Sequence, residues 1–228
     1  MVVLAVDTST NVCTAALMKD RGPAHEISVE VRSGHSGRLL PVIDTLFGLS
    51  PFSKEDVGLI TVGVGPGSFT GIRIAIATAR GLSLALGCPL VGANTLDALA
   101  WGALPSALPI MPVIDARKSE VFCRLYAPDG NPLTSPMNLR PGNLGEIVSD
   151  ETLFIGNGVE LYREVLSRTL GTRFQEGPEH LWYPRASVLG RMALLQVSRG
   201  EYRPAQPLYV RPSDAALALE RMKPGEQR

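Results

Sequence analysis

A glycine-rich segment, residues 65–71, has the strongest potential for chemistry in this chain, with the sequence Gly-Pro-Gly-Ser-Phe-Thr-Gly. The apolar run before it, residues 59–64, predicts a buried strand, and the proline-free residues 72–86 predict a helix. Such a turn directs backbone N–H groups and the positive end of the helix dipole at whatever lies in front, so it could bind an anion. It could equally be a tight corner that lets a helix pack closely against a sheet.

Two further turns begin with an aspartate and follow predicted strands: residues 7–10 and residues 115–119. A nucleotide clamped between such turns needs glycines for close backbone approach, with the aspartates serving a metal ion. The first turn has no glycine, and the second carries Arg117 and Lys118 where glycines would help. The glycine-rich segment also lacks the lysine of a Walker A loop. A structural role is therefore at least as well supported as ATP binding.

Other catalytic patterns are missing from the sequence. No two histidines have the i, i+3 or i, i+4 spacing of a helical metal site, and Ser68 does not have the spacing of a nucleophile elbow. No cysteine has an activating neighbour. We expect no metal, no catalytic residue and no cofactor. The histidines and cysteines considered for these roles are His25, His35, His180, Cys13, Cys88 and Cys123.

Composition predicts a soluble, cytoplasmic protein that does not cross a membrane. The 228 residues are 45% hydrophobic, enough for a core, and 22 basic side chains balance 22 acidic ones. Without net charge there is no global attraction for nucleic acid, so contact with RNA needs a local patch or a partner. The N-terminus has no basic segment typical of a signal peptide, and the three scattered cysteines indicate reduced thiols.

The elements that position these residues follow the same order in both halves of the chain. A strand leads to an aspartate-containing turn and a returning strand, and later a strand leads through a glycine turn into a helix. This order predicts an α/β protein with two lobes, residues 1–104 and 105–223, facing each other across a cleft, and a frayed tail at 224–228. A late amphipathic helix at residues 187–198 is a candidate to pack back on the first lobe. Thr95 is the expected cap of a short helix.

Two helices of the first half offer more apolar surface than one sheet can cover. Residues 72–86 are apolar nearly all round, which predicts burial on every side, and residues 36–49 carry a broad apolar stripe. We expect a partner to dock there, with burial by the second lobe as the alternative. The predicted interface residues are Leu39, Leu40, Ile43, Leu46, Phe47, Ile72, Arg73, Ala75, Ile76, Ala79 and Arg80, behind a corner formed by Gly65, Pro66, Gly67, Ser68, Phe69, Thr70 and Gly71.

Several motifs together resemble the bacterial TsaB (YeaZ) family. The most specific is Gly-Pro-Gly-Ser-Phe-Thr-Gly-Ile-Arg at residues 65–73, and the others are spread along most of the chain. They lie at residues 7–9, 32–36 with 39–41, 115–122, 156–158, 183–186 and 207–211.

The resemblance implies an actin-like ATPase fold, of the Hsp70 and sugar-kinase superfamily, with two α/β lobes. It also implies a part in making threonylcarbamoyladenosine on tRNA beside the anticodon. In that family the chain is a non-catalytic scaffold that pairs with a catalytic paralogue, TsaD; an ATPase, TsaE, joins the complex. Leu39 stands where the metal-binding His-x-x-x-His of the paralogue would continue from His35, which argues against peptidase or transferase activity here.

Two alternatives remain open at this stage. The paired aspartate turns would suit an ATP-binding phosphotransferase or ATPase that uses the cleft between the lobes. The apolar helices would also allow a two-fold homodimer of the isolated protein. Contact with tRNA is expected through the complex.

Overall fold

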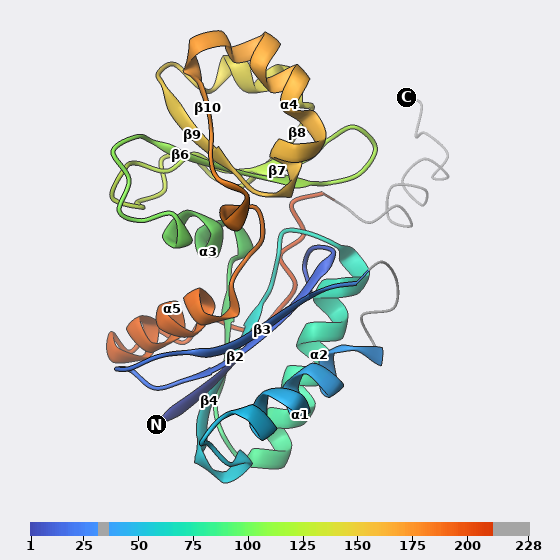
Figure 1. Ribbon diagram of the computed structural model, residues 1–228, viewed down its shortest axis with the longest axis vertical. Helices are drawn as coiled ribbons and strands as arrows, with labels where there is room; N and C mark the ends of the chain where they lie inside the picture. Colours follow the sequence, from blue (N-terminus) through green and yellow to red (C-terminus); the bar gives the residue numbers. More distant parts are fainter. Residues whose placement is uncertain (32–36, 212–228) are drawn as a thin grey trace, which may run out of the picture.

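The computed structural model describes residues 1–31 and 37–211, which form two lobes (Figure 1). Each lobe contains one five-stranded mixed sheet. The strand order is β3-β2-β1-β4-β5 in the first sheet and β10-β9-β6-β7-β8 in the second. The predicted two-lobed α/β architecture is confirmed.

In the first lobe, two antiparallel hairpins precede a parallel pair of strands. β1, β2 and β3 pair in sequence order, and β4 then pairs parallel to both β1 and β5. The strands are β1 (Val2–Asp7), β2 (Val12–Met18), β3 (His25–Glu30), β4 (Val57–Gly63) and β5 (Leu90–Ala93). The helices that pack on this sheet are α1 (Leu39–Leu49), α2 (Phe69–Leu86) and α5 (Ala186–Ser198), and a 3₁₀ turn, η2 (Lys54–Asp56), precedes β4.

The central strand β1 is buried on both faces, which explains its continuous apolar sequence. Leu4 and Val6 point to the core shared with α1 and α2. Val3 and Ala5 point the other way, to clusters that contain residues of α5. Because side chains alternate along a strand, the same six residues support helices on both sides of the sheet.

The second lobe has the same strand–turn–strand start. β6 pairs antiparallel with β7 and parallel with β9, and α4 packs on one face of the sheet. Its strands are β6 (Ile110–Asp115), β7 (Val121–Cys123), β8 (Met137–Leu139), β9 (Thr152–Ile155) and β10 (Phe174–Glu176). Its helical segments are α4 (Asn157–Leu170), η3 (Pro141–Glu146), η4 (Gly171–Arg173) and η5 (Glu179–Leu181). The short strands β8 and β10 were not predicted.

The two lobes exchange helices. α3 (Thr95–Gly102) follows the last strand of the first sheet, yet Leu96 and Leu99 pack against Ile110 and Ile114 of the second. Conversely, α5 follows the second sheet and packs across the first, where Leu189 contacts the cluster around Ala5. The two sheets are therefore built from successive parts of the chain, but the helices that cover them are not.

Several predicted helix boundaries need correction. The cap of α3 is Asn94, whose Oδ1 accepts hydrogen bonds from two backbone N–H groups, and not Thr95. α2 begins at Phe69, inside the glycine-rich segment, because Ser68 caps it. The expected helix start at Ser36 lies outside the described residues, as do the motif at 32–36 and the tail at 224–228; α1 itself begins at Leu39.

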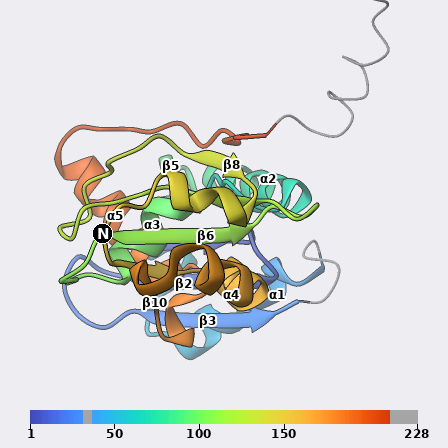
Figure 2. The same cartoon turned by 90° about the horizontal axis from the view of Figure 1, so that it is seen from above.

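The segment after α5 runs along one side of the molecule, where it is red in Figure 2. The carbonyl of Arg203 accepts a hydrogen bond from the Gly92 N–H at 2.9 Å, and the Leu208 N–H donates to the Val64 carbonyl at 2.8 Å. Arg211 then forms an ion pair with Glu120 of the second lobe at 2.8 Å. This segment covers the outer edge of β5 and connects the two lobes.

Candidate functional site

The glycine-rich corner is docked onto the turn that follows β1. The Ser68 N–H donates to the carbonyl of Ser9 at 2.6 Å, and the Thr8 hydroxyl donates to the carbonyl of Gly71 at 2.7 Å. Two crossed hydrogen bonds therefore join segments about sixty residues apart in the sequence. They fix the start of α2 against the first strand.

This docking requires glycine at two positions of the motif. A Cβ on Gly67 would overlap the carbonyl oxygen of Ser9, and a Cβ on Gly71 would overlap that of Thr8. The corner also uses its own donors, since the Gly71 N–H donates to the Ser68 hydroxyl at 3.2 Å and the Ile72 N–H to the Ser68 carbonyl. The geometry therefore favours the close-packing interpretation of the motif over the anion-binding one.

The aspartate of the first turn is buried. Asp7 has no exposed surface, and its carboxylate accepts hydrogen bonds from the Ser9 N–H, the Ser9 hydroxyl and, at 3.4 Å, the Thr95 hydroxyl. Burial raises the pKa of Asp7, and these hydrogen bonds offset part of that rise. β4 also passes so closely that a Cβ on Gly63 would overlap the carboxylate. In this arrangement the Asp7 carboxylate is packed inside the first lobe and hydrogen-bonded within the chain.

The corresponding turn of the second lobe lies at the surface. Asp115 itself is only 9% exposed and accepts a hydrogen bond from the Arg117 N–H at 2.9 Å, but the Arg117 side chain is 83% exposed. Arg117, Lys118 and Ser119 all have φ near +60°, a left-handed conformation that costs non-glycine residues energy. The two aspartate turns therefore face different environments and do not form a matched pair of phosphate loops.

Two family motifs meet beside the corner, a contact that the sequence did not reveal. The guanidinium of Arg73 lies 3.7 Å from the centre of the Phe69 ring, and its Nε donates to the Tyr209 hydroxyl at 2.8 Å. The rings of Phe69 and Tyr209 stack with centroids 5.0 Å apart. Arg73 and Tyr209 are 136 positions apart in the sequence, so local pattern could not predict their contact. The motif at residues 207–211 was the only sequence feature that pointed to Tyr209.

Most of the predicted interface residues belong to the core of the first lobe. These seven are buried against its own sheet: Leu39, Ile43, Leu46, Ile72, Ala75, Ile76 and Ala79. Within the chain these residues are covered by its own sheet, and the expectation that α2 is buried on every side is corrected. Sequence pattern alone could not distinguish the face of each helix that meets the sheet from the opposite face.

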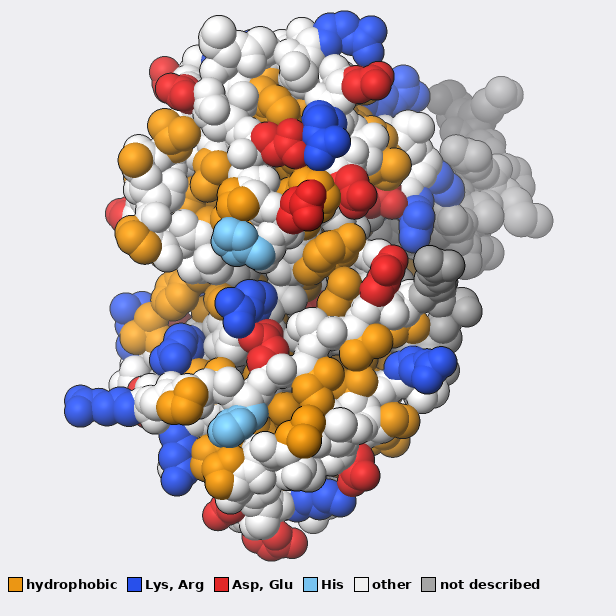
Figure 3. Space-filling view, in the orientation of Figure 1, with side chains coloured by type: hydrophobic (Ala, Val, Ile, Leu, Met, Phe, Trp, Pro, Cys, Tyr) orange, Lys and Arg blue, Asp and Glu red, His pale blue; other side chains and the backbone are white. Residues whose placement is uncertain are grey.

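The opposite faces of α1 and α2 remain exposed and include apolar side chains. Leu40 and Leu49 on α1 are 52% and 72% exposed, and Leu84 on α2 is 85% exposed. Of the other predicted interface residues, Phe47 is half-buried, and Arg73 and Arg80 are exposed. Hydrophobic side chains gather on the lower lobe along β3 and α1 (Figure 3).

By length and composition, α2 would suffice to cross a membrane. Its 18 residues have a mean hydropathy of 1.3 and include two arginines, Arg73 and Arg80. In the fold its apolar side chains have another explanation, because Ile72, Ala75 and Ile76 pack in the core beside β4.

Across residues 1–31 and 37–211, no three side chains of the histidine, cysteine, aspartate and glutamate types come together as potential metal ligands. His35, where the paralogue's motif would begin, lies outside these ranges.

Comparisons with known proteins agree with this geometry. The family model for TsaD, tRNA N6-adenosine threonylcarbamoyltransferase, matches residues 29–192. The tRNA threonylcarbamoyladenosine biosynthesis protein TsaB of Escherichia coli is 31% identical over 223 residues, covering 92% of this chain and 95% of its own length.

Solved structures are also similar to this chain. A Pseudomonas aeruginosa protein described as similar to the peptidase YEAZ has a TM-score of 0.76 and 29% identity, covering 92% of this chain and 99% of its own. Component A of (R)-2-hydroxyglutaryl-CoA dehydratase from Acidaminococcus fermentans has a TM-score of 0.52 and 12% identity over 86% of this chain and 99% of its own, and so shows the fold alone.

Two lobes built on mixed five-stranded sheets, with the glycine corner docked on the first hairpin, define an actin-like ATPase fold. Within that class, the match over most of the chain is more specific. The chain belongs to the TsaB (YeaZ) family.

Proposed function

We propose that this chain is a scaffold subunit of the complex that installs threonylcarbamoyl on adenosine beside the tRNA anticodon. Family membership supports involvement in tRNA threonylcarbamoyladenosine biosynthesis. In this proposal the chain binds a TsaD-like catalytic paralogue. A TsaE-like ATPase joins the complex, and tRNA is reached through it.

The exposed apolar side chains of α1 and α2 carry the proposal. Leu84 and Leu49 are largely exposed although both helices have buried an apolar face in the core. Between Arg73 and Leu84 the outer side of α2 also carries Ala77 and Gly81, small residues that let another backbone approach. The docking surface is therefore the outer face of α1 and α2, centred on Leu40, Leu49, Ala77, Gly81 and Leu84.

The alternative of an ATP-using enzyme in the cleft has less support. A metal–nucleotide site needs an accessible carboxylate and free backbone donors at the glycine turn. Asp7 is buried, and the N–H groups of Ser68, Gly71 and Ile72 bond within the chain. The scaffold function does not require these groups.

Leu84→Arg tests the surface without disturbing the core. An arginine at Ala75 or Ala79 would be a poor test, because both are fully buried and a charge there would unfold the lobe. Leu161→Arg on α4 is the matched control, since that leucine is 59% exposed on the second lobe. Each full-length variant is titrated by calorimetry with the TsaD-like protein of the same organism, and its oligomeric state is measured by light scattering.

We expect Leu84→Arg to weaken binding at least about a hundredfold, an effect typical of a central interface residue, and Leu161→Arg to leave it unchanged. Equal binding by both variants would show that the interface lies elsewhere. Loss of self-association alone would assign the surface to a homodimer.

A further inference from the structure

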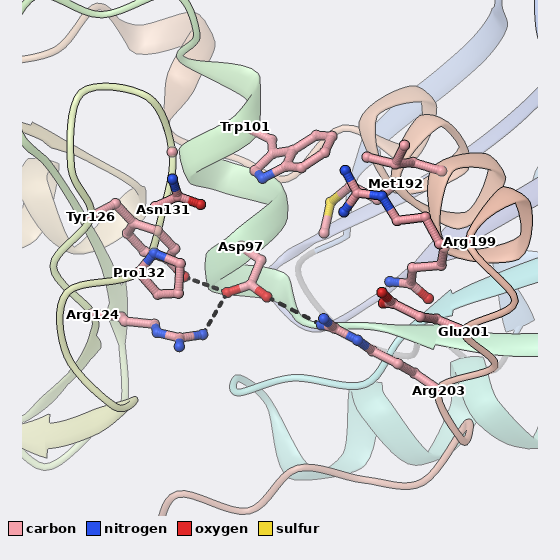
Figure 4. Close-up of a pocket in the computed structure, with 13 residues that line it drawn as sticks. Asp97, Trp101, Arg124, Tyr126, Asn131, Pro132, Met192, Arg199, Glu201 and Arg203 are labelled. Atoms are coloured by element: carbon pink, nitrogen blue, oxygen red, sulfur yellow. Dashed lines mark hydrogen bonds and ion pairs between the residues drawn. The ribbon is translucent and has the colours of Figure 1, made fainter.

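A cavity of about 270 Å³ lies where α3, α5 and the segment after β7 meet. Trp101 lines it from α3, and Met192 and Arg199 line it from α5 and its C-terminal cap (Figure 4). Asn131 and Pro132 form the side contributed by the second lobe. The exchange of helices between the lobes creates this cavity, which is separate from the docking surface on α1 and α2.

Asp97 fixes one wall of the cavity. Its carboxylate accepts hydrogen bonds from the Arg124 guanidinium at 2.8 Å and the Tyr126 hydroxyl at 2.6 Å, and it lies 3.7 Å from Arg203. Burial above all, and then the charge of Asp97, raises the pKa of Tyr126, so its hydroxyl remains a donor. These contacts saturate the negative charge of Asp97.

Other polar groups of the lining have no side-chain partner within residues 1–31 and 37–211. They are the guanidinium of Arg199, the carboxylate of Glu201 and the indole N–H of Trp101. Gln196 is 93% buried, and its Oε1 accepts no hydrogen bond there. A buried acceptor without a donor is costly, and a ligand or a water normally satisfies it.

Charge and shape together define what would fit. Three arginines face two carboxylates in the lining, which leaves one excess positive charge for an anionic group. The indole of Trp101 and the thioether of Met192 offer a surface for a flat ring. Glu201 and Gln196 supply acceptors for a hydrogen-bond donor. The volume lies just below the usual range of about 300–1,000 Å³ for ligand pockets, so the ligand is small.

We propose that this cavity binds a small organic anion that carries an aromatic ring and a hydrogen-bond donor. An aromatic amino acid and an amino-substituted nucleoside monophosphate share that chemistry. The ring stacks on Trp101, the anionic group pairs with Arg199, and the donor is accepted by Glu201 or Gln196. This inference does not depend on the proposed scaffold function.

The two tryptophans of the chain provide the readout. Trp101 lines the cavity, whereas Trp182 is buried in the second lobe and donates to the Gly177 carbonyl at 3.2 Å. The ¹⁵N-labelled full chain is titrated separately with L-phenylalanine and with adenosine 5′-monophosphate, and both indole N–H resonances are followed. Trp101→Phe assigns the resonances. The comparison probes are 3-phenylpropanoate, which lacks the ammonium group, and inosine 5′-monophosphate, which lacks the amino group.

We expect one probe to shift the Trp101 resonance saturably, with a dissociation constant of about a millimolar or tighter, while the Trp182 resonance stays in place. Its comparison probe should bind more weakly. Arg199→Gln should weaken binding about tenfold, and Arg168→Gln, at an exposed position on α4, should not. The probe that binds identifies the source of the ligand. Shifts of neither resonance, shifts of both together, or equal affinity of the two arginine variants would overturn the proposal.

Discussion

Each lobe has a turn that begins with an aspartate after its first strand, and the two turns lie in different environments. At the end of β1, Asp7 is fully buried, whereas at the end of β6 the Asp115 side chain is 9% exposed and the residues that follow at 117–119 lie at the surface. The difference comes from where the following glycine corner packs. In the first lobe Gly67 and Gly71 press against the turn itself.

In the second lobe the glycine corner at residues 156–158 packs against β6 before the turn, not against the turn itself. A Cβ on Gly156 or Gly158 would overlap Val113, two residues before Asp115. The Asn157 amide reaches the turn, where its Oδ1 accepts from the Asp115 N–H at 3.1 Å, and the Tyr162 hydroxyl donates to the Asp115 carboxylate at 3.4 Å. A shift of a few residues in packing therefore accompanies the difference between a turn that is part of the core and one whose residues 117–119 lie at the surface.

The largest expected effect distinguishes the two aspartates. Asp7→Ala leaves three buried donors without an acceptor, so we expect it to lower the free energy of unfolding by about 3–5 kcal/mol. Asp115→Ala should cost less, about 1–2 kcal/mol, because the partners that it leaves are the N–H and guanidinium of the exposed Arg117 and a long contact of 3.4 Å from the Tyr162 hydroxyl. Urea denaturation measures both. Equal losses would remove the contrast between the lobes.

The effect of pH sharpens the same comparison. Because burial raises the pKa of Asp7 above its ordinary 3.8, the folded state binds the proton more tightly than the unfolded state. The stability that this adds is fully present below pH 3.8 and is lost as the pH rises through the raised pKa. The cost of Asp7→Ala should therefore shrink as the pH rises, and a cost that grows instead would contradict burial as the dominant cause.

The next effect concerns the glycines of α2. Gly71→Ala places a Cβ on the Thr8 carbonyl and should cost about 3 kcal/mol. Gly81→Ala, on the same helix, meets open space and should stabilise by up to about 1 kcal/mol. The midpoint temperatures of thermal unfolding of the two variants should shift in opposite directions. If both changes are tolerated, the corner is not closely packed.

The smallest expected effects again have opposite signs in the two turns. Ser9→Gly removes a hydroxyl that donates to Asp7 at 2.7 Å and should cost about 2 kcal/mol. Ser119→Gly relieves a left-handed conformation at φ 59° and should stabilise by about 1 kcal/mol. Chemical denaturation would measure both, and destabilisation by Ser119→Gly would mean that its side chain has an essential contact.

Much of the architecture could be predicted from local sequence. Apolar runs predicted β1, β6 and β9, the glycine segment marked the junction of β4 and α2, and family motifs identified the fold. Short strands such as β8 were missed because three residues carry too little pattern. The predicted interface combined buried and exposed residues, because periodicity reveals that a helix has apolar sides, but not which side the sheet covers.

The sequence by itself determined which segments become strands and helices, where the chain turns, and the family to which it belongs. These properties depend on neighbours within a few positions, whose spacing and backbone preferences are local. The tertiary structure alone decided that Asp7 is buried, that α3 and α5 exchange lobes, and that Trp101 and Arg199 line one cavity. Those outcomes depend on contacts between distant segments, where differences of a few ångströms in packing determine which side chains meet water.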